Sequence, residues 1–369
     1  MLKSLAPTFE QETGAKVIME DTPWAQLYEK VALELSSGAN RYSAMLLPAQ
    51  WIQSLNQYLE PIDDKDLISD DFLESLVNLY QYDGKQYGVP YYVMVLMLYY
   101  RTDIFEAAGL EPPETWEEFT EVMVALKEKL PSIDTNVTAP TSIPLKRTTH
   151  SSAFFNNYLW GLGKDVIDSS GTVTLDCPEA RESLQFMSDL YNKYQVIPEN
   201  SFELSFTEAS DLFSQGRLAS CFDYNRAIAT YSDPEASQIV GKWDCVATPG
   251  DSAYTGPWGI TMPLNAPEKE LGYAFIRWIT NEENMTALAE VGSATGRKST
   301  YSAPSVVEKI AQMPQIMNGA LVGRVETWPQ YEAVSQILLV GISDAVSQAK
   351  TVDQAITDMT AEITALLSD

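Results

Sequence analysis

Few side chains in this sequence could act as catalytic bases, nucleophiles or metal ligands. His150 is the only histidine, and its polar, turn-rich surroundings, KRTTHSSAF, hold no nucleophile motif of the GxSxG kind. The cysteines form no CxxC pair, and phosphate-binding GxxxxGK[ST] and GxGxxG motifs are missing. The 51 acidic residues are uninformative, because some pair of carboxyls in so acidic a chain will always have the spacing of a glycosidase. We therefore expect no metal and no cofactor.

The charge balance excludes further classes of function. The 369 residues include 24 Lys and Arg against 51 Asp and Glu, a net charge of −27. Such a chain lacks the clustered cations that nucleic acids or anionic membranes require. The longest apolar run, Val89–Tyr100, is well short of the roughly 20 residues that span a bilayer. We expect a water-exposed protein that binds no nucleic acid.

Two of the three cysteines leave an alternative open. Cys221 in LASCFDY and Cys245 in KWDCVATP lie in short β-like runs, whereas Cys177 lies elsewhere. The first two either form one disulfide or stay buried free thiols, of which we favour the thiols.

The elements that must position any site alternate between helix and strand, which predicts an α/β fold with parallel sheets flanked by helices. A chain of this length is expected to form two domains. An Asp83-Gly84 turn, a capping box of Thr115 and Glu118, and Pro90 within a strand pair are the clearest local signals. We expect helices over residues 1–13, 23–37, 115–130, 176–194, 209–215 and 271–279, and strands over 16–20, 44–47, 87–100, 239–249 and 258–262.

Four stretches resemble the extracellular solute-binding proteins of carbohydrate ABC importers, the group that includes maltose-binding protein. They are Tyr82–Phe119 (with YYRTDIF and PPETWEEF), Ser201–Ala227 (with SQGRLASCFDYNRA), Gly256–Asn284 (with GPWGI and FIRWI) and Thr351–Ile363 (TVDQAITDMTAEI). The resemblance extends from about residue 4 to residue 367. It departs from the family pattern in two places: no strand precedes the first helix, and Ser43 follows Tyr42 where the family commonly has Asp. Either the gene product is truncated or its first sheet is built differently.

The resemblance implies a two-lobe fold of the periplasmic-binding-protein type II class, with the ligand in a cleft between the lobes. The first lobe is expected to comprise residues 1–93 and 260–314, and the second residues 97–254 and 319–369. Hinge segments are expected near 93–96, 254–260 and 314–319, where the chain crosses. Ligand would then close the cleft by hinge motion.

Aromatic platforms and planar polar side chains are what a sugar cleft needs, because sugars present an apolar C–H face and a hydroxyl edge. In the first lobe, Trp258 lies between glycines at a crossover and is the strongest candidate. Trp24, Gln50 and Trp51 follow expected strand ends, where ligands often bind. Of Tyr91 and Tyr92 one should line the cleft and the other should pack, and strand alternation decides which. Trp116, Trp243 and Trp278 are interpreted as structural.

The second lobe offers further candidates. Asn156 and Trp160 share one helical face, and their alternative role is core packing. Asp223, Tyr224 and Arg226 form a polar trio directly after an expected strand. Two further candidates, Arg297 in the expected first lobe and Trp328 in the expected second lobe, match family cleft positions more loosely.

These residues lead to one functional prediction and its rivals. We expect a non-enzymatic, monomeric protein that captures a mono- or oligosaccharide and delivers it to an ABC transporter permease. The alternatives are a carboxylate-based glycosidase or lyase and a sensory binding protein on the same fold. No secretory signal is visible at the start of the chain, so the protein is either cytoplasmic or has lost a leader. The resemblance favours a periplasmic or extracellular, membrane-associated location.

Overall fold

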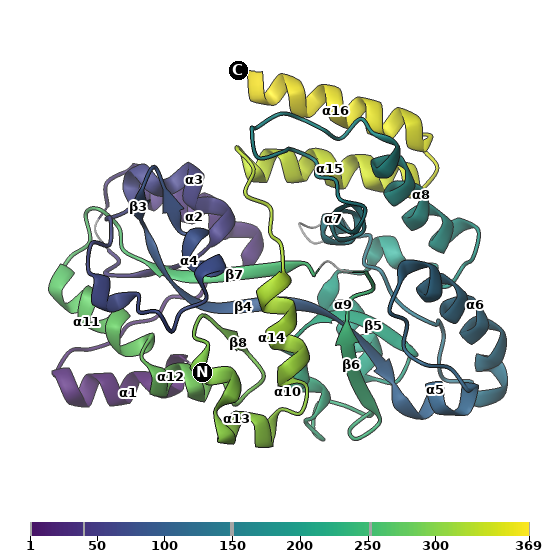
Figure 1. Ribbon diagram of the computed structural model, residues 1–369, viewed down its shortest axis with the longest axis horizontal. Helices are drawn as coiled ribbons and strands as arrows, with labels where there is room; N and C mark the ends of the chain where they lie inside the picture. Colours follow the sequence, from purple (N-terminus) through teal and green to yellow (C-terminus); the bar gives the residue numbers. More distant parts are fainter. Residues whose placement is uncertain (1, 40, 148–150, 251–252, 369) are drawn as a thin grey trace. The chain divides into compact units, whose positions relative to one another are not determined.

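The computed structural model describes residues 2–39, 41–147, 151–250 and 253–368. They form two compact units, unit 1 with residues 1–93 and 256–313, and unit 2 with residues 94–255 and 314–369. The chain therefore passes between the units at three points (Figure 1). His150 lies outside the described residues.

Unit 1 is built around a short sheet in the order β1-β7-β4, with β8 also paired to β4. Strand β7 runs antiparallel to β1 and places Trp258 opposite Pro48. The helices of this unit pack around the sheet (Figure 1). Its elements are α1 (Leu2–Thr13), α2 (Trp24–Ser36), β1 (Met45–Pro48), the 3-10 turn η1 (Ala49–Trp51), α3 (Ile52–Leu55), η2 (Asn56–Tyr58), η3 (Lys65–Leu67), α4 (Glu74–Asn78), β2 (Gln81–Tyr82), β3 (Lys85–Gln86), the first part of β4 (Gly88–Arg101), β7 (Thr255–Thr261), α11 (Lys269–Ile279), α12 (Glu282–Ala289), β8 (Ala294–Thr295), η5 (Ser299–Ser302) and α13 (Pro304–Lys309).

The core of unit 1 joins both of its chain segments. Val89 and Tyr91 of β4 pack with Ile260 of β7 and with Ile276 of α11. Tyr80 is fully buried, and its hydroxyl donates to the carbonyl oxygens of residues 47 and 257, each at 3.1 Å. The Tyr80 side chain thus holds the end of β1 beside the start of β7, without any contribution from a ligand.

Unit 2 has the second part of β4 between β5 and β6, both antiparallel to it. Helices α15 and α16 lie side by side at one end, with α8 packed against both (Figure 1). Its elements are α5 (Thr102–Ala108), α6 (Trp116–Ile133), α7 (Ser151–Gly161), α8 (Pro178–Asn192), η4 (Ser201–Glu203), α9 (Phe206–Ser214), β5 (Ser220–Tyr224), α10 (Ala227–Tyr231), β6 (Trp243–Ala247), α14 (Met313–Val322, whose first residue is in unit 1), α15 (Tyr331–Val346) and α16 (Val352–Ser368).

Several local signals gave correct predictions. The Thr115 hydroxyl accepts from the amide of Glu118 at 3.2 Å, and the Glu118 carboxylate accepts from the Thr115 amide, which completes the capping box. Asp83 and Gly84 both have positive φ in the β2-β3 hairpin. The structural interpretation of three tryptophans is confirmed as well: Trp116 packs on Phe119 and Phe222, Trp278 packs on Phe9 and Phe275, and the Trp243 indole N–H donates to the carbonyl of residue 231.

Three expectations were wrong. Residues 16–20 form no strand, although Val17 and Met19 are partly buried and Ile18 is exposed in a strand-like alternation. No strand pairs with this segment among the described residues, and a cavity of about 450 Å³ is lined by both this segment and β1. The expected strand pair around Pro90 is one continuous strand, because Pro90 stands near its beginning, where a missing N–H interrupts little of the ladder. The strand pairs whose registers are resolved are antiparallel rather than parallel.

The cysteines are free thiols, which excludes the disulfide alternative. Cys221 of β5 and Cys245 of β6 both lie opposite Tyr99 of β4, one on each side of that strand. Two strand spacings of about 4.8 Å place their Cα atoms beyond the roughly 7 Å that a disulfide can bridge.

Candidate functional site

An aromatic cluster in unit 1 gathers most of the expected first-lobe residues. We define it as Trp24, Tyr28, Trp51, Tyr91, Tyr92 and Trp258. The Trp258 ring is nearly parallel to that of Tyr92, at 5.9 Å between centroids and 15° between planes. Trp24 stacks on Trp51 at 5.3 Å and meets Trp258 edge-on at 5.7 Å. Five rings predicted from separate parts of the sequence are therefore in one place.

The local backbone explains how these rings converge. Pro23 starts α2, so Trp24 is the first residue of that helix. Pro48 ends β1 and starts η1, which carries Gln50 and Trp51. Because Pro48 is the β-ladder partner of Trp258, the strand end and the crossover tryptophan are adjacent.

Exposure divides the cluster into a supporting layer and a ligand-accessible layer. Trp51 and Tyr91 are buried at 1% and 2% exposure, whereas Trp24, Tyr92 and Trp258 are only partly buried. Strand alternation thus assigns Tyr91 to the core of unit 1 and leaves Tyr92 with accessible surface. An apolar ligand face could stack on the partly exposed rings.

Gln50 adds a polar group near these rings. Its side chain is buried at 6% exposure, and its Oε1 has no hydrogen-bond partner among the described residues. Buried polar atoms are normally paired, so an unpaired amide oxygen points to a missing donor. A ligand hydroxyl could supply that donor.

A second group of residues in unit 2 surrounds a buried carboxyl, Glu326. Its Oε1 accepts from the Asn156 side-chain amide, and its Oε2 accepts from the Tyr254 hydroxyl, both at 2.7 Å. Trp160, one turn after Asn156 on α7, stacks on Tyr254 at 5.8 Å and 13°. Arg324 lies over the Trp160 ring at 4.8 Å and is ion-paired with Asp165 at 2.6 Å. We call Asn156, Trp160, Tyr254 and Glu326 the Glu326 group.

The Glu326 group combines an unusual proton affinity with unpaired polar atoms. Burial raises the pKa of Glu326 to about 7, against the bonds from Tyr254 and Asn156, which lower it. No Lys or Arg among the described residues forms an ion pair with Glu326, which is 1% exposed. Asn156 Oδ1 and Trp160 Nε1 are buried and have no hydrogen-bond partner within the part of the chain that the structure describes.

The expectation that Asp223, Tyr224 and Arg226 all follow a strand was wrong, because Asp223 and Tyr224 are the last two residues of β5 and only Arg226 comes after it. Asp223 is 2% exposed and accepts from the Tyr224 amide and the Tyr231 hydroxyl, each at 2.7 Å. Burial raises its pKa, although those bonds lower it. Tyr224 is also buried and stacks on Phe206 at 5.4 Å, whereas Arg226 is exposed. Ligand contacts by these residues stay predictions, and the partners of Asp223 favour a structural role for it.

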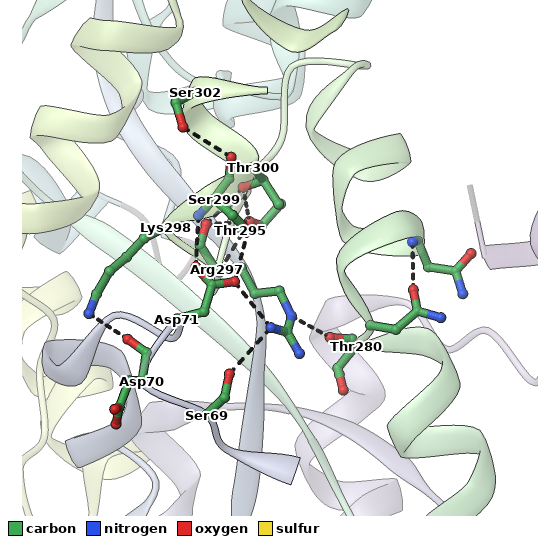
Figure 2. A network of polar contacts seen from close by, with 12 residues as sticks. Ser69, Asp70, Asp71, Thr280, Thr295, Arg297, Lys298, Ser299, Thr300 and Ser302 are labelled. Atoms are coloured by element: carbon green, nitrogen blue, oxygen red, sulfur yellow. Dashed lines mark hydrogen bonds and ion pairs between the residues drawn. The ribbon is translucent and has the colours of Figure 1, made fainter. Parts of the chain in front are cut away.

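Arg297 belongs to a polar network inside unit 1 (Figure 2). Its Nε donates to the carbonyl of Thr280 at 2.7 Å, its Nη1 is 3.1 Å from the Asp71 carboxylate, and its guanidinium lies 4.4 Å from the centroid of the Phe72 ring. The Asp71 carboxylate also accepts from the amide and hydroxyl of Ser299. These contacts explain Arg297 as a structural residue, so its ligand contact stays an unsupported prediction.

Trp328 also has a packing explanation. It is 5% exposed and lies 6.5 Å from Tyr331, the first residue of α15. Its contact with a ligand stays a prediction.

Sequence reasoning missed Glu326, Tyr254 and Arg324. The motif VETWPQY drew attention to Trp328 alone, because a single Glu among 51 acidic residues carries no signal. Tyr254 precedes the GPWGI stretch and could have been noted as its flank. Only the fold brings these residues to α7.

The described residues contain no group of three or more His, Cys, Asp and Glu side chains that could hold a metal ion. No helix within the described ranges is long and apolar enough to cross a membrane.

Solved structures identify the class of fold. Maltose-bound MalE3 of T. maritima superposes with a TM-score of 0.89 at 24% identity, over 99% of this chain and 95% of that one. A solute-binding protein of Agrobacterium radiobacter K84 in complex with ribitol gives 0.88 at 23% identity, with the same coverage. The chain thus has the two-lobe α/β fold of ABC-importer binding proteins.

Sequence comparison then identifies the family. The model of the bacterial extracellular solute-binding protein family matches residues 4–315, and the chain belongs to that family. One similar relative, a probable amino-acid ABC transporter periplasmic-binding protein of Sinorhizobium fredii, is 20% identical over 98% of this chain and 85% of its own length. The arabinooligosaccharide-binding protein of Halalkalibacterium halodurans is 28% identical over 49% of this chain and 40% of its own length.

Proposed function

We propose that this protein captures a neutral carbohydrate or polyol outside the cytoplasm and delivers it to the permease of an ABC transporter. The observation that carries the proposal is the aromatic cluster of unit 1, in which Trp24, Tyr92 and Trp258 keep accessible surface while stacked on one another. Parallel and edge-on indole and phenol rings are suited to the C–H face of a sugar. The maltose, ribitol and arabino-oligosaccharide ligands of similar proteins support the same class.

Each unit holds buried polar atoms that lack a hydrogen-bond partner among the described residues. Gln50 Oε1 in unit 1, and Asn156 Oδ1 and Trp160 Nε1 in unit 2, are buried atoms that need a partner. A polyhydroxylated ligand both donates and accepts, so its hydroxyls suit the unpaired acceptor of unit 1 and the unpaired acceptor and donor of unit 2.

We infer that the protein is not an enzyme. A glycosidase needs two carboxyls on either side of the bond that it cleaves, one of them with a raised pKa. Glu326 and Asp223 both have raised pKa values, but their oxygens accept from Asn156, Tyr254 and Tyr231 within unit 2. These bonds account for the two buried carboxyls without a reaction.

An amino acid is the competing ligand class, because one relative is described as a probable amino-acid binding protein. A zwitterion requires a cation for its carboxylate. Among the candidate residues, Arg297 is already paired with Asp71, which leaves the exposed Arg226 as the available cation. One exposed cation among the candidate residues gives little support to a ligand carboxylate, so a neutral ligand is favoured.

Thermal unfolding against a panel of sugars, polyols, sugar acids and amino acids tests the proposal. A ligand at 100 times its Kd stabilises the native state by about 2.7 kcal/mol, which raises the melting temperature measurably. We expect a shift with neutral sugars or polyols and an unchanged ligand after incubation. A shift with amino acids alone, or formation of a product, would contradict the proposal.

A further inference from the structure

The orientation of the Asn156 amide follows from its neighbour Glu326. The Asn156 amide nitrogen donates to Glu326 Oε1 at 2.7 Å, which leaves Asn156 Oδ1 as the free end of the side chain. An ionised carboxylate can only accept hydrogen bonds, so it can hold only the nitrogen end of an amide. Glu326 therefore determines which end of Asn156 is available.

The free atoms beside this carboxyl form a complementary pair. Asn156 Oδ1 is an acceptor, and Trp160 Nε1, one helical turn later on α7, is a donor. A hydroxyl group can donate to the first and accept from the second at the same time. A carboxylate or phosphate oxygen has no proton to donate, and it would leave Asn156 Oδ1 unpaired next to a negative charge.

We propose that Glu326 is a specificity-determining positioning residue, which fixes the Asn156 amide so that Asn156 and Trp160 accept a neutral ligand hydroxyl and reject an anion. The proposal rests on the carbohydrate function proposed above. It assigns to the Glu326 group a chemical selectivity that distinguishes sugars and polyols from sugar acids and phosphates. Glu326 acts through Asn156 and makes no contact with the ligand itself.

The buried position of Glu326 makes this selectivity depend on the protonation state of its carboxyl, and therefore on pH. Burial raises the pKa of Glu326 to about 7. A proton on Oε1 turns that oxygen into a donor, which binds Asn156 Oδ1 and turns the amide nitrogen outward. Asn156 Oδ1 is then no longer available to accept a hydrogen bond from a ligand hydroxyl.

Tyrosines make up most of the titratable surroundings of Glu326 within the described residues. The groups that face Glu326 are Tyr254, Tyr224 and Tyr331, with Asp165 and Arg324 as an ion pair. Burial raises the pKa of each of the three tyrosines above its usual value, so they stay neutral between pH 6 and pH 8. The raised pKa of Glu326, about 7, lies inside this range.

The expected size of the effect follows from the fraction of molecules in which Glu326 is ionised at each pH. With a pKa near 7, about nine-tenths of the molecules have ionised Glu326 at pH 8 and about one-tenth at pH 6. If only the ionised form is competent, the Kd for a neutral ligand rises about tenfold between these pH values.

Calorimetric titration with maltose and ribitol at pH 6 and pH 8 tests the proposal, with glucuronate as the anionic probe. Wild type should lose about tenfold in affinity at pH 6 for whichever neutral probe binds, and should bind glucuronate more weakly than that neutral probe at pH 8. Glu326→Gln, which cannot ionise, should show equal affinities at the two pH values. Glu121→Gln, on the exposed face of α6, is the matched control and should behave like wild type.

The outcomes separate the two proposals. Binding of a neutral probe with the same pH dependence in wild type and Glu326→Gln would overturn the role of Glu326 and leave the carbohydrate function intact. Failure of wild type to bind any neutral sugar or polyol at pH 8 would overturn the function and the subsite together. A circular dichroism spectrum and melting temperature of Glu326→Gln at pH 6 verify that the variant is folded.

Discussion

The Trp258 indole lies nearly parallel to the Tyr92 ring, with 5.9 Å between centroids and 15° between planes, although the two residues belong to different segments of unit 1. Trp24 completes this surface by meeting Trp258 edge-on. The three partly exposed rings form a platform that neither chain segment could build alone.

Replacing Trp258 with alanine should weaken sugar binding at least tenfold, about 1.4 kcal/mol. The methyl group of alanine cannot replace the stacking surface, and the Tyr92 ring loses its support. Calorimetry with the best ligand of the sugar panel measures the change. Trp278→Leu is the control, since Trp278 is a partly buried tryptophan of the same unit that packs on Phe9 and Phe275. Equal losses in both variants would indicate a general effect of destabilisation.

Arg297→Ala should destabilise the protein by about 2–4 kcal/mol and leave the affinity for the ligand unchanged. The substitution removes the ion pair of the half-buried Asp71, which keeps only the bonds from Ser299, and the hydrogen bond to the carbonyl of Thr280 (Figure 2). Chemical denaturation measures the stability, and calorimetry at a temperature where the variant is folded measures the affinity. A folded variant with normal stability and lost binding would restore Arg297 to the ligand site.

Stability should depend on pH through Glu326. Burial raises its pKa in the folded protein to about 7 from an ordinary value of 4.5, so the folded state binds the proton more tightly than the unfolded state. The resulting stabilisation is complete below pH 4.5 and is lost as the pH rises through 7; a shift of this size corresponds to about 3 kcal/mol. Wild type should therefore lose more stability than Glu326→Gln between pH 5 and pH 8, as measured by urea denaturation. Parallel pH profiles would show that Glu326 titrates normally.

Reducing agents should not change the melting temperature, because the cysteines are free. Burial raises the thiol pKa of Cys221 and of Cys245, whereas Cys177 is only partly buried. A thiol reagent should therefore modify Cys177 first and the other two only as the protein unfolds. A mass two hydrogens lower than that of the reduced chain would contradict the free thiols.

Local chemistry explains which parts of the fold could be predicted from the sequence. The capping box of Thr115 and the Asp83-Gly84 turn are formed by neighbouring residues, so their patterns were sufficient. The strand expected over residues 16–20 failed because a strand also needs a partner, and residue alternation does not identify one. Whether Cys221 and Cys245 could form a disulfide depended on the order of the strands in the sheet. Strand β4 lies between the strands that carry them, and the sequence does not reveal that order.

The same distinction between local signals and contacts of distant residues applies to the candidate site. Trp24, Trp51, Tyr92 and Trp258 were predicted because large aromatic residues beside prolines and glycines are conspicuous in a sequence. Glu326 was not, because its importance comes from burial and from Asn156 and Tyr254, which are far from it in the chain. A carboxyl among many becomes distinctive only through its surroundings.

The most direct measurement is a calorimetric titration of the purified protein with maltose, ribitol and arabino-oligosaccharides at pH 8, followed by mass spectrometry of the recovered ligand. We predict saturable binding of one such ligand per chain and recovery of the ligand unchanged. Absence of binding to every neutral sugar and polyol, or recovery of a cleaved ligand, would contradict the proposal that this protein is a carbohydrate-binding component of an ABC importer.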